Sequence, residues 1–250
     1  MGNKLYGTVL LKAKRIMDVL FMSEDDLSLD EISSKAHIPK PTTFKILNTL
    51  DYIDFVRKNN DDKKYSLGTQ MIGYGNKAMD SFNIVSIAEP YLEDLGKVTN
   101  ETVNLGIEEN SKIVLLKKID SPQTVNLNSK VGGTLELYSS SMGKAILATK
   151  SDEELDRYFS KVELKPLTEN TITSISELKR QLKQVRKDEY AVDHQENQDE
   201  VVCVGTAIQK YGKVFGAISV STPKYRLDDL LFDDLKKLII STRDQIIKVI

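Results

Sequence analysis

The sequence predicts an α+β protein in which a linker helix joins an N-terminal winged helix-turn-helix to an α/β domain with an antiparallel sheet. Within residues 1–67, short amphipathic segments come in the order helix, turn, helix, hairpin. From Glu101 onward the apolar period changes to two, and strand-like runs alternate with helix-like ones. The chain therefore divides into a winged domain (1–67), a linker helix (68–83) and a larger domain (84–250).

The first expected helix covers residues 8–22, where apolar residues recur near helical spacing. We expect it to pack beneath the other two helices of the winged domain. Its expected core residues are Val9, Ala13, Ile16, Val19, Leu20 and Met22.

Residues 29–67 contain the elements that define a winged helix-turn-helix. A short helix at 29–36 and a tight turn at 37–39 precede a second helix at 41–50. Two alternating strands follow at 52–57 and 64–67, split by the polar turn 58–63. A helix of this size fits a DNA major groove, and the hairpin can reach the flanking backbone.

The remaining elements follow from the same periodicities. Residues 68–83 form a linker helix weakened by Gly73 and Gly75, and Pro90 interrupts or bends a helix at 84–98. In the larger domain we expect strands at 102–109, 112–120, 124–131, 190–197, 200–210 and 214–222. Helices are expected at 139–150, 151–160, 175–190 and 227–250. The helix at 175–190 should bury Ile175, Leu178, Leu182 and Val185.

Composition narrows the class of protein. The 250 residues carry a net charge of -2 and one cysteine, Cys203, so no disulfide forms within the chain. No apolar run approaches the roughly 18 residues that a membrane span needs. The N-terminus lacks the charged-then-apolar pattern of a signal peptide. We therefore expect a soluble cytoplasmic protein without membrane contact.

The second helix of the winged domain and the hairpin supply the expected DNA contacts. Asparagine bonds adenine edges, and lysine and threonine reach bases or phosphates. Cations near the wing tip neutralise phosphates. The expected contacts are Lys40, Thr42, Thr43, Phe44, Lys45, Asn48, Arg57, Lys58, Lys63 and Lys64. Thr43 also belongs to the apolar stripe with Ile46, Leu47 and Leu50. The alternative is a winged fold used for protein contacts, with these polar residues merely solvated.

Two blocks of sequence resemble the IclR family of bacterial transcription regulators. The first is IPKPTTFKILNTL in the winged domain, and the second joins SSSMGKAILA, TITSISELKRQLKQVRKDEYAVDHQEN and VVCVGTAIQKYGKVFGAISVSTP. The resemblance covers essentially the whole chain. It implies a GAF-like ligand-sensing domain, dimers or tetramers, no cofactor and no catalysis.

The chain departs from the family pattern at several positions. Pro41 replaces the usual serine, and Phe44 stands where a polar residue is common. Asp188-Glu189 and Asp199-Glu200 stand where glycines are common. Ser141-Met142 occupies a position where small residues often line the effector pocket. We therefore expect Met142 to shrink or close the cavity, which favours a small effector.

The resemblance places the effector pocket on Ser141, Met142, Asp193, Cys203, Ser219 and Ser221, and we add Gly143. A hairpin centred on Gln198 sets Asp193 opposite Cys203 on one sheet face. A turn centred on Tyr211 likewise sets Ser219 opposite Cys203, although a one-residue slip reverses the face. The helix start around Gly143 offers backbone N–H groups to an anion.

Enzymatic and metal-binding alternatives have little support. Asp193 and His194 are adjacent on a strand, so at most one of them can face Cys203 and a catalytic triad cannot form. The two histidines, His37 and His194, fall in different domains, so no metal site is expected. Gly143-Lys144-Ala145 lacks the earlier glycine of a phosphate loop. A lone strand cysteine is also commonly just a small buried hydrophobe.

The function that these features predict is a ligand-responsive, DNA-binding transcription regulator, with repression the favoured mode. A pair of winged domains should dock on a palindromic double-stranded DNA operator, because one domain reads only a half-site. The larger domain should bind a small organic acid or sugar acid and shift the paired heads through the linker. The alternative is an effector-independent regulator whose C-terminal domain serves only oligomerisation, and an enzyme ranks third.

Overall fold

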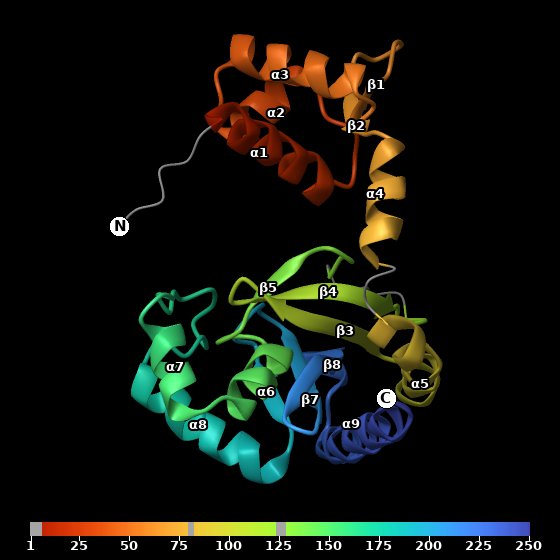
Figure 1. Cartoon of the computed structure of the whole chain (residues 1–250). Coiled ribbons are helices and arrows are strands. Elements are labelled where there is room, and N and C mark those ends of the chain that lie inside the picture. The colour runs from red at the N-terminus through yellow and green to blue at the C-terminus, as the bar shows by residue number, and fades with distance from the viewer. Residues whose placement is uncertain (1–6, 80–82, 124–128) are drawn as a thin grey trace. The chain divides into compact units, whose positions relative to one another are not determined.

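A computed structural model describes residues 7–79, 83–123 and 129–250 of the chain. The chain divides into two compact units, Met1–Ser81 and Phe82–Ile250. Figure 1 shows the helices and strands of each unit.

The N-terminal unit is a winged helix-turn-helix, as the sequence predicts. Its elements are α1 (Thr8–Met22), α2 (Leu29–Ala36), α3 (Lys40–Tyr52), β1 (Val56–Lys58), β2 (Tyr65–Leu67) and α4 (Gln70–Met79). The two strands pair antiparallel and form the wing. Its core includes Ile16, Ile32 and Leu47, all fully buried.

Local chemistry explains where these helices begin and end. Ser28 and Glu31 form a reciprocal capping box at the start of α2. His37 ends α2 with a left-handed backbone (φ 52°), and Pro39 directly precedes α3. The turn between α2 and α3 is thus specified at both ends.

Two expectations for this unit are wrong. Tyr52 belongs to α3 instead of the first strand, because the helix runs on to it and the wing begins only at Val56. Val9 and Met22 are 56% and 66% exposed, so α1 buries a narrower stripe than its spacing predicts.

The C-terminal unit combines a six-stranded sheet with five α-helices among its described residues. Its helices are α5 (Asn83–Thr99), α6 (Ser141–Thr149), α7 (Asp152–Phe159), α8 (Ile175–Asp188) and α9 (Asp229–Val249), and α5 continues through Pro90. Its strands are β3 (Thr102–Glu109), β4 (Lys112–Ile119), β5 (Thr134–Glu136), β6 (Ala191–His194), β7 (Val201–Lys210) and β8 (Lys213–Pro223). A 3₁₀ turn, η1 (Lys224–Arg226), follows β8.

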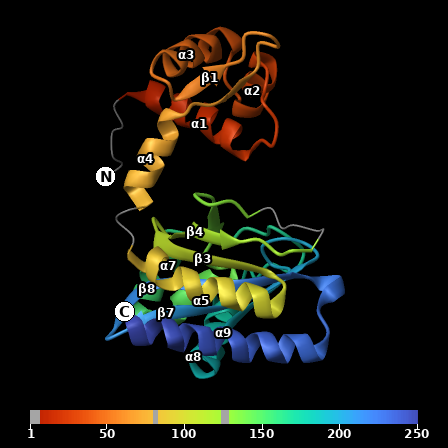
Figure 2. The ribbon, with the colours of Figure 1, turned by 90° about the vertical axis from the view of Figure 1, so that its right-hand side faces the viewer.

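Helices cover both faces of this sheet. The strand order is β5-β4-β3-β8-β7-β6, and every neighbouring pair is antiparallel. Helices α5 and α9 lie side by side on one face, as Figure 2 shows. Helix α6 packs on the other face, over β7 and β8, with α8 behind it. The strands near α6 are therefore buried on both faces.

Three further expectations need correction. The strand expected at 124–131 lies largely outside the described residues, and 129–131 are not in a strand. Strand β5 was not expected. In the β7–β8 hairpin, Cys203 faces Ser221 and Ser219 faces Gly205, because the turn is the two-residue Tyr211-Gly212 instead of one centred on Tyr211, and a bulge at Ile208/Gln209 adds one further residue to the shift. Ile175, expected in the core, is 42% exposed.

The turn and the bulge each shift the register by one residue, and together they preserve the predicted sheet face. The partner of Cys203 moves by two residues, from Ser219 to Ser221, and side chains alternate faces with a period of two. Both serines therefore share the face of Cys203. The other predicted pairing, Asp193 opposite Cys203, is confirmed.

Among the residues that the structure describes, no helix is both long enough and apolar enough to span a lipid bilayer.

Candidate nucleic-acid interface and effector site

Helix α3 presents a polar face away from the core of the N-terminal unit. Lys45 and Asn48 are exposed, and Thr42 is half-buried beside them. Phe44 is 42% exposed on the same side. Lys40 is exposed and pairs with Asp30 at 2.5 Å. These side chains present the donor, acceptor and apolar groups that read base edges.

Thr43 is not available to DNA, so its place among the expected contacts is wrong. Its side chain is fully buried, and its hydroxyl donates to the carbonyl of Ile38 at 3.2 Å. This bond ties α3 to the turn after α2. Its burial agrees with its predicted place in the apolar stripe of α3.

The wing carries the expected cations, three of which already have partners. Arg57 Nε donates to Ser66 Oγ at 2.8 Å, and the Lys58 ammonium lies 5.4 Å from the centre of the Tyr65 ring. Lys63 Nζ donates to the carbonyl of Asn60 at 2.5 Å. These contacts hold the side chains near the wing and leave further N–H groups to reach phosphates.

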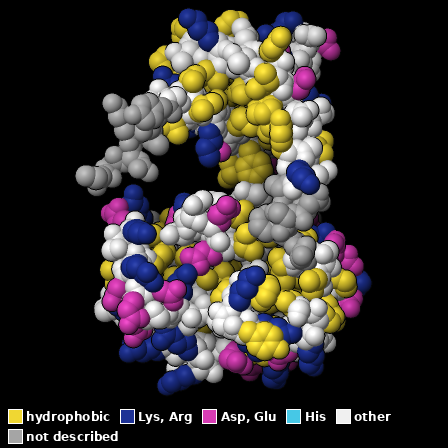
Figure 3. Space-filling view, viewed as in Figure 1, with side chains coloured by type: hydrophobic (Ala, Val, Ile, Leu, Met, Phe, Trp, Pro, Cys, Tyr) yellow, Lys and Arg dark blue, Asp and Glu magenta, His cyan; other side chains and the backbone are white. Residues whose placement is uncertain are grey.

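Helix α1 also leaves an apolar patch on the N-terminal unit. Val9, Leu10 and Leu11 are 56%, 70% and 47% exposed. In Figure 3, hydrophobic side chains gather on the face of this unit that is drawn toward the viewer. A contiguous exposed patch of this kind is typical of an interaction surface.

In the C-terminal unit, polar side chains form a row across four neighbouring strands. Thr102 on β3 faces Ser221 on β8, which faces Cys203 on β7, which faces Asp193 on β6. Directly opposed residues share a sheet face, so all four project toward the side that α6 covers. We call these four residues the polar row.

A second row lies beside the polar row, one step along each strand on the same face. Asn104 faces Ser219, which faces Gly205. Asn104 Nδ2 donates to Ser221 Oγ at 3.3 Å, which links the two rows. Ser219 is buried on the same face.

Helix α6 begins directly above this second row. A Cβ atom added to Gly205 would come within 2.8 Å of Ser141 Oγ and 2.9 Å of Met142 N, so only glycine allows this approach. Ser140 caps the helix through its hydroxyl. Among the described residues, the N–H groups of Ser141 and Met142 have no acceptor, and such groups favour an anion.

Two of the expected effector residues have structural roles instead. The N–H of Gly143 donates to Ser140 Oγ at 3.2 Å, and a Cβ there would lie 2.3 Å from Leu137 Cα. Gly143 is therefore a close-packing residue and presents no free donor. The Met142 side chain packs in the hydrophobic core, 3.6 Å from a Cβ built on Gly106. Gly106 lies one step along β3 from Asn104 on the same sheet face, so the expectation that Met142 limits the size of the pocket stays a prediction.

Asp193 combines a structural bond with an unusual protonation equilibrium. Its Oδ1 accepts the backbone N–H groups of Glu196 at 2.6 Å and Asn197 at 3.3 Å, which shapes the turn after β6. Burial raises the pKa of Asp193 to about 7, although these N–H groups and the nearby Lys144 ammonium favour the ionised form. Near neutral pH this carboxyl group can therefore donate or accept.

Next to Asp193 lies a buried ion pair that the sequence did not reveal. The ammonium of Lys144, which is completely buried, bonds Glu196 and lies 3.3 Å from Gln181 Oε1. Burial raises the pKa of Glu196, and its Oε2 atom has no hydrogen-bond partner in the part of the chain that the structure describes. Two carboxyl groups thus share one ammonium, which gives the cluster a surplus acidic group.

The geometry disfavours the enzymatic alternatives. His194 lies on the other sheet face, where its ring approaches Phe232, and Asp193 faces Cys203, as predicted. Burial and the Asp193 carboxylate raise the pKa of the Cys203 thiol, which disfavours the nucleophilic thiolate. No group of three His, Cys, Asp or Glu in the described ranges is arranged to hold a metal ion.

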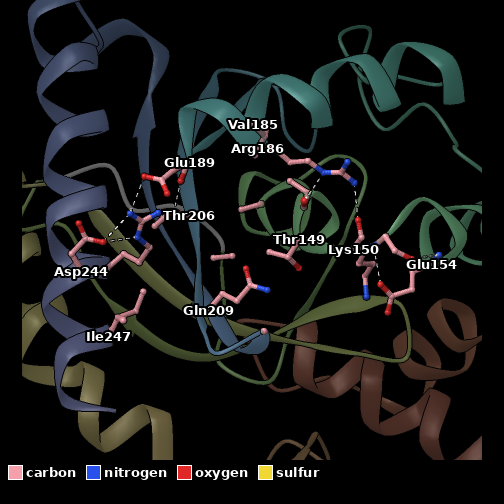
Figure 4. A pocket seen from close by; sticks show the side chains of 16 residues that line it. Thr149, Lys150, Glu154, Val185, Arg186, Glu189, Thr206, Gln209, Asp244 and Ile247 are labelled. Atoms are coloured by element: carbon pink, nitrogen blue, oxygen red, sulfur yellow. Dashed lines mark hydrogen bonds and ion pairs between the residues drawn. The ribbon is translucent and has the colours of Figure 1, made fainter.

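A separate groove of about 800 Å³ lies between α6, α8, β7 and α9 (Figure 4). Its charged groups have partners: Arg243 bonds Glu189 and Asp244, and Arg186 donates to the carbonyls of Ala148 and Lys150. None of the expected effector residues lines this groove. The polar row and the groove are thus distinct features.

Comparison with known protein families matches most of the chain. Residues 9–60 match the IclR helix-turn-helix domain, and residues 76–248 match the C-terminal domain of the bacterial transcriptional regulator IclR. Together the two matches reach from α1 to the end of α9.

Individual relatives agree with these matches. The HTH-type transcriptional regulator KdgR of Escherichia coli is 30% identical over 207 residues, which are 82% of this chain and 79% of KdgR. The transcriptional repressor IclR of Escherichia coli is 25% identical over 240 residues, 95% of this chain and 88% of that protein. The crystal structure of Thermotoga maritima IclR superposes with a TM-score of 0.77 at 33% identity, covering 96% of this chain and 98% of that one.

Proposed function

Because this chain belongs to the IclR family of bacterial transcription regulators, we propose that it is a repressor that leaves its DNA operator when a small organic acid or sugar acid binds the C-terminal unit. That it is a DNA-binding transcription regulator follows from the family. Repression is proposed from the similarity to the E. coli repressor. Its place of action is then the cytoplasm, where the bacterial chromosome lies.

The DNA half of the proposal assigns sequence reading to α3 and phosphate contact to the wing. Lys45 and Asn48 are the exposed polar residues on α3 best placed to meet base edges. Arg57, Lys58 and Lys63 line the wing with positive charge. Lys40, Thr42, Phe44 and Lys64 complete the proposed contact surface.

Binding as a pair is the second part of the proposal. One winged domain reads a half-site, so a palindromic operator needs two domains held together. The exposed apolar residues of α1 supply a surface that a second copy would cover. We propose a homodimer or homotetramer on this basis.

The effector half rests on one observation: a buried polar row lies beside a helix start that has free N–H groups. Ser141 and Met142 supply these N–H groups for a carboxylate. Ser219, Ser221 and Asp193 supply groups for hydroxyl or keto oxygens, with Cys203 between them. An acid that also carries hydroxyl or keto oxygens satisfies both parts of the site.

The experiment that tests this function measures whether an acid that binds the C-terminal unit changes the affinity of the protein for DNA. An operator is selected from random duplex DNA with the purified full-length protein, and its affinity is followed by fluorescence anisotropy while hydroxy, keto and sugar acids are added. We expect one of these acids to weaken operator binding. Ser219→Ala, which removes a hydroxyl of the second row, should reduce this effect without changing operator affinity in the absence of the acid.

The alternative is a regulator whose C-terminal unit only oligomerises. The near-complete burial of Thr102, Ser219 and Ser221 favours it, because ligand entry then needs some movement of the chain. If none of the acids changes the melting temperature or the operator affinity of the protein, the alternative replaces the proposed effector function.

A further inference from the structure

Thr102 stands out among the buried polar groups of the sheet. It is the first residue of β3 and is 1% exposed, yet its hydroxyl has no hydrogen-bond partner among the described residues. A buried hydroxyl without a partner lowers the stability of the folded chain and needs an explanation. A ligand that supplies the missing partner is one such explanation, and it requires that the hydroxyl face a site.

The strand register aims Thr102 at the proposed effector site. It occupies one end of the polar row, and Asp193 occupies the other end. Ser221, the direct neighbour of Thr102 in that row, bonds both Asn104 and Cys203. The chain thus offers polar groups continuously from β3 to β6 on one sheet face.

The length of the row sets the size of a ligand that contacts both ends. Neighbouring strands lie about 4.8 Å apart, so the three spacings between Thr102 and Asp193 cover about 14 Å. In an extended six-carbon acid the terminal oxygens lie about 8.5 Å apart, because each carbon–carbon bond of about 1.5 Å advances the chain by about 1.3 Å. A hydrogen bond of about 2.8 Å at each end brings the total to about 14 Å. A three-carbon acid reaches only about 10 Å by the same sum.

We propose that Thr102 is a specificity-determining residue of the effector site, where its hydroxyl bonds the far end of an extended polyhydroxy acid of about six carbons. This inference rests on the proposed effector function and names its ligand class. It names a larger ligand than the small effector expected from Met142, because the polar row runs from β3 to β6 while the Met142 side chain packs beside Gly106.

The chain offers a matched control in Thr222. Its side chain is also completely buried, and its hydroxyl also has no partner. It lies next to Ser221 on β8 and faces Val202, so its side chain projects to the opposite sheet face. Valine at either position removes one unpaired hydroxyl with little change of shape, but only Thr102→Val changes the proposed site.

The experiment measures the binding of two probes, D-gluconate and D-glycerate, to the full-length protein by isothermal titration calorimetry. We expect the wild type to bind gluconate more tightly than glycerate. Thr102→Val should weaken gluconate binding roughly tenfold, as the loss of one hydrogen bond predicts, and leave glycerate binding unchanged. Thr222→Val should change neither affinity, and Thr102→Ser, which keeps the hydroxyl, should restore gluconate binding.

Each other outcome overturns the inference. It is wrong if gluconate does not bind, if glycerate binds as tightly as gluconate, or if Thr102→Val and Thr222→Val have equal effects on gluconate. Should Thr102→Val melt early, Thr102→Ala removes the same hydroxyl and is subject to the same criteria. The proposed function survives these outcomes if another acid still releases the operator in a Ser219-dependent way.

Discussion

Replacing Asp193 by asparagine should change how the stability of the protein depends on pH. Asparagine keeps an Oδ1 acceptor for the N–H groups of Glu196 and Asn197, so the turn after β6 is retained. It removes the titratable carboxyl group, whose pKa burial raises from an ordinary value of 3.8 to about 7. The variant therefore isolates the protonation of Asp193 from its structural bond.

The direction and size of the effect follow from linkage. Below pH 3.8, Asp193 is protonated in both the folded and the unfolded chain. Between pH 3.8 and about 7 the unfolded chain loses this proton while the folded chain keeps it, so wild-type stability falls as pH rises. A pKa difference of about 3 units corresponds to about 4 kcal/mol at most, at 1.36 kcal/mol per unit. Above pH 7 this contribution is fully lost.

Urea unfolding followed by circular dichroism, at intervals between pH 4 and 8, measures the free energy of unfolding of both proteins. We expect the advantage of Asp193→Asn over the wild type to grow with pH and to level off above pH 7. Asp233→Asn is a flat control: the bond from Lys236 lowers the pKa of Asp233 below 3.8, so the difference between this variant and the wild type should stay constant between pH 4 and 8. A constant difference for Asp193→Asn across the pH range would refute the reasoning.

Three further predictions concern DNA and assembly. Lys45→Ala and Asn48→Ala should each weaken binding to the selected operator by about 1 to 3 kcal/mol and leave binding to random duplexes nearly unchanged in anisotropy titrations. Lys63→Ala and Lys64→Ala should weaken binding to all sequences and reduce the slope of log affinity against log salt by about one each. Sedimentation should show a dimer or tetramer at micromolar concentration, and Leu10→Glu should shift it toward the monomer if α1 forms the contact; a wild-type monomer would contradict the paired-head model.

Most helices and strands could be predicted from the sequence because apolar periodicity reports directly on secondary structure. Helix α1 covers the residues predicted for it, and so does α2. Burial within α1 was less predictable. Val9 lies on the apolar side of the helix yet is exposed, because amphipathicity does not distinguish a core from a surface that a partner covers.

The effector site was readable only in part, for three physical reasons. The partner of Cys203 moved by two residues, one from the Tyr211-Gly212 turn and one from the bulge at Ile208/Gln209, and no turn signal in the sequence places a bulge. Gly143 fits an anion-binding glycine and a close-packing glycine equally well, and only the contact with Leu137 separates these roles. Thr102 carried no signal, because a hydroxyl without a partner is visible only when its neighbours are placed.

At two positions where the family pattern commonly has glycine, other residues adopt the backbone conformation that glycine favours. Glu189 and Glu200 adopt φ values of 63° and 59°, in the left-handed region that glycine enters most easily. Other contacts hold the two residues there: Glu189 pairs with Arg243, and the N–H of Glu200 donates to Gln195 Oε1. A departure from the family sequence therefore does not by itself imply a different turn.

The charge buried beside the polar row bears on the choice between a sensing and a purely oligomerising C-terminal unit. Unpaired hydroxyls alone do not decide it, since Thr222 has one on the opposite sheet face. Charge is the stronger argument, because Asp193 and Glu196 are buried around a single ammonium, Lys144, and burial raises the pKa of both carboxyl groups. Replacing a buried ionic cluster by apolar residues of similar volume often leaves a protein at least as stable. A unit needed only for oligomerisation would lose nothing by that replacement, whereas a unit that binds an acid near Asp193 needs a carboxyl group that can donate a proton to the ligand.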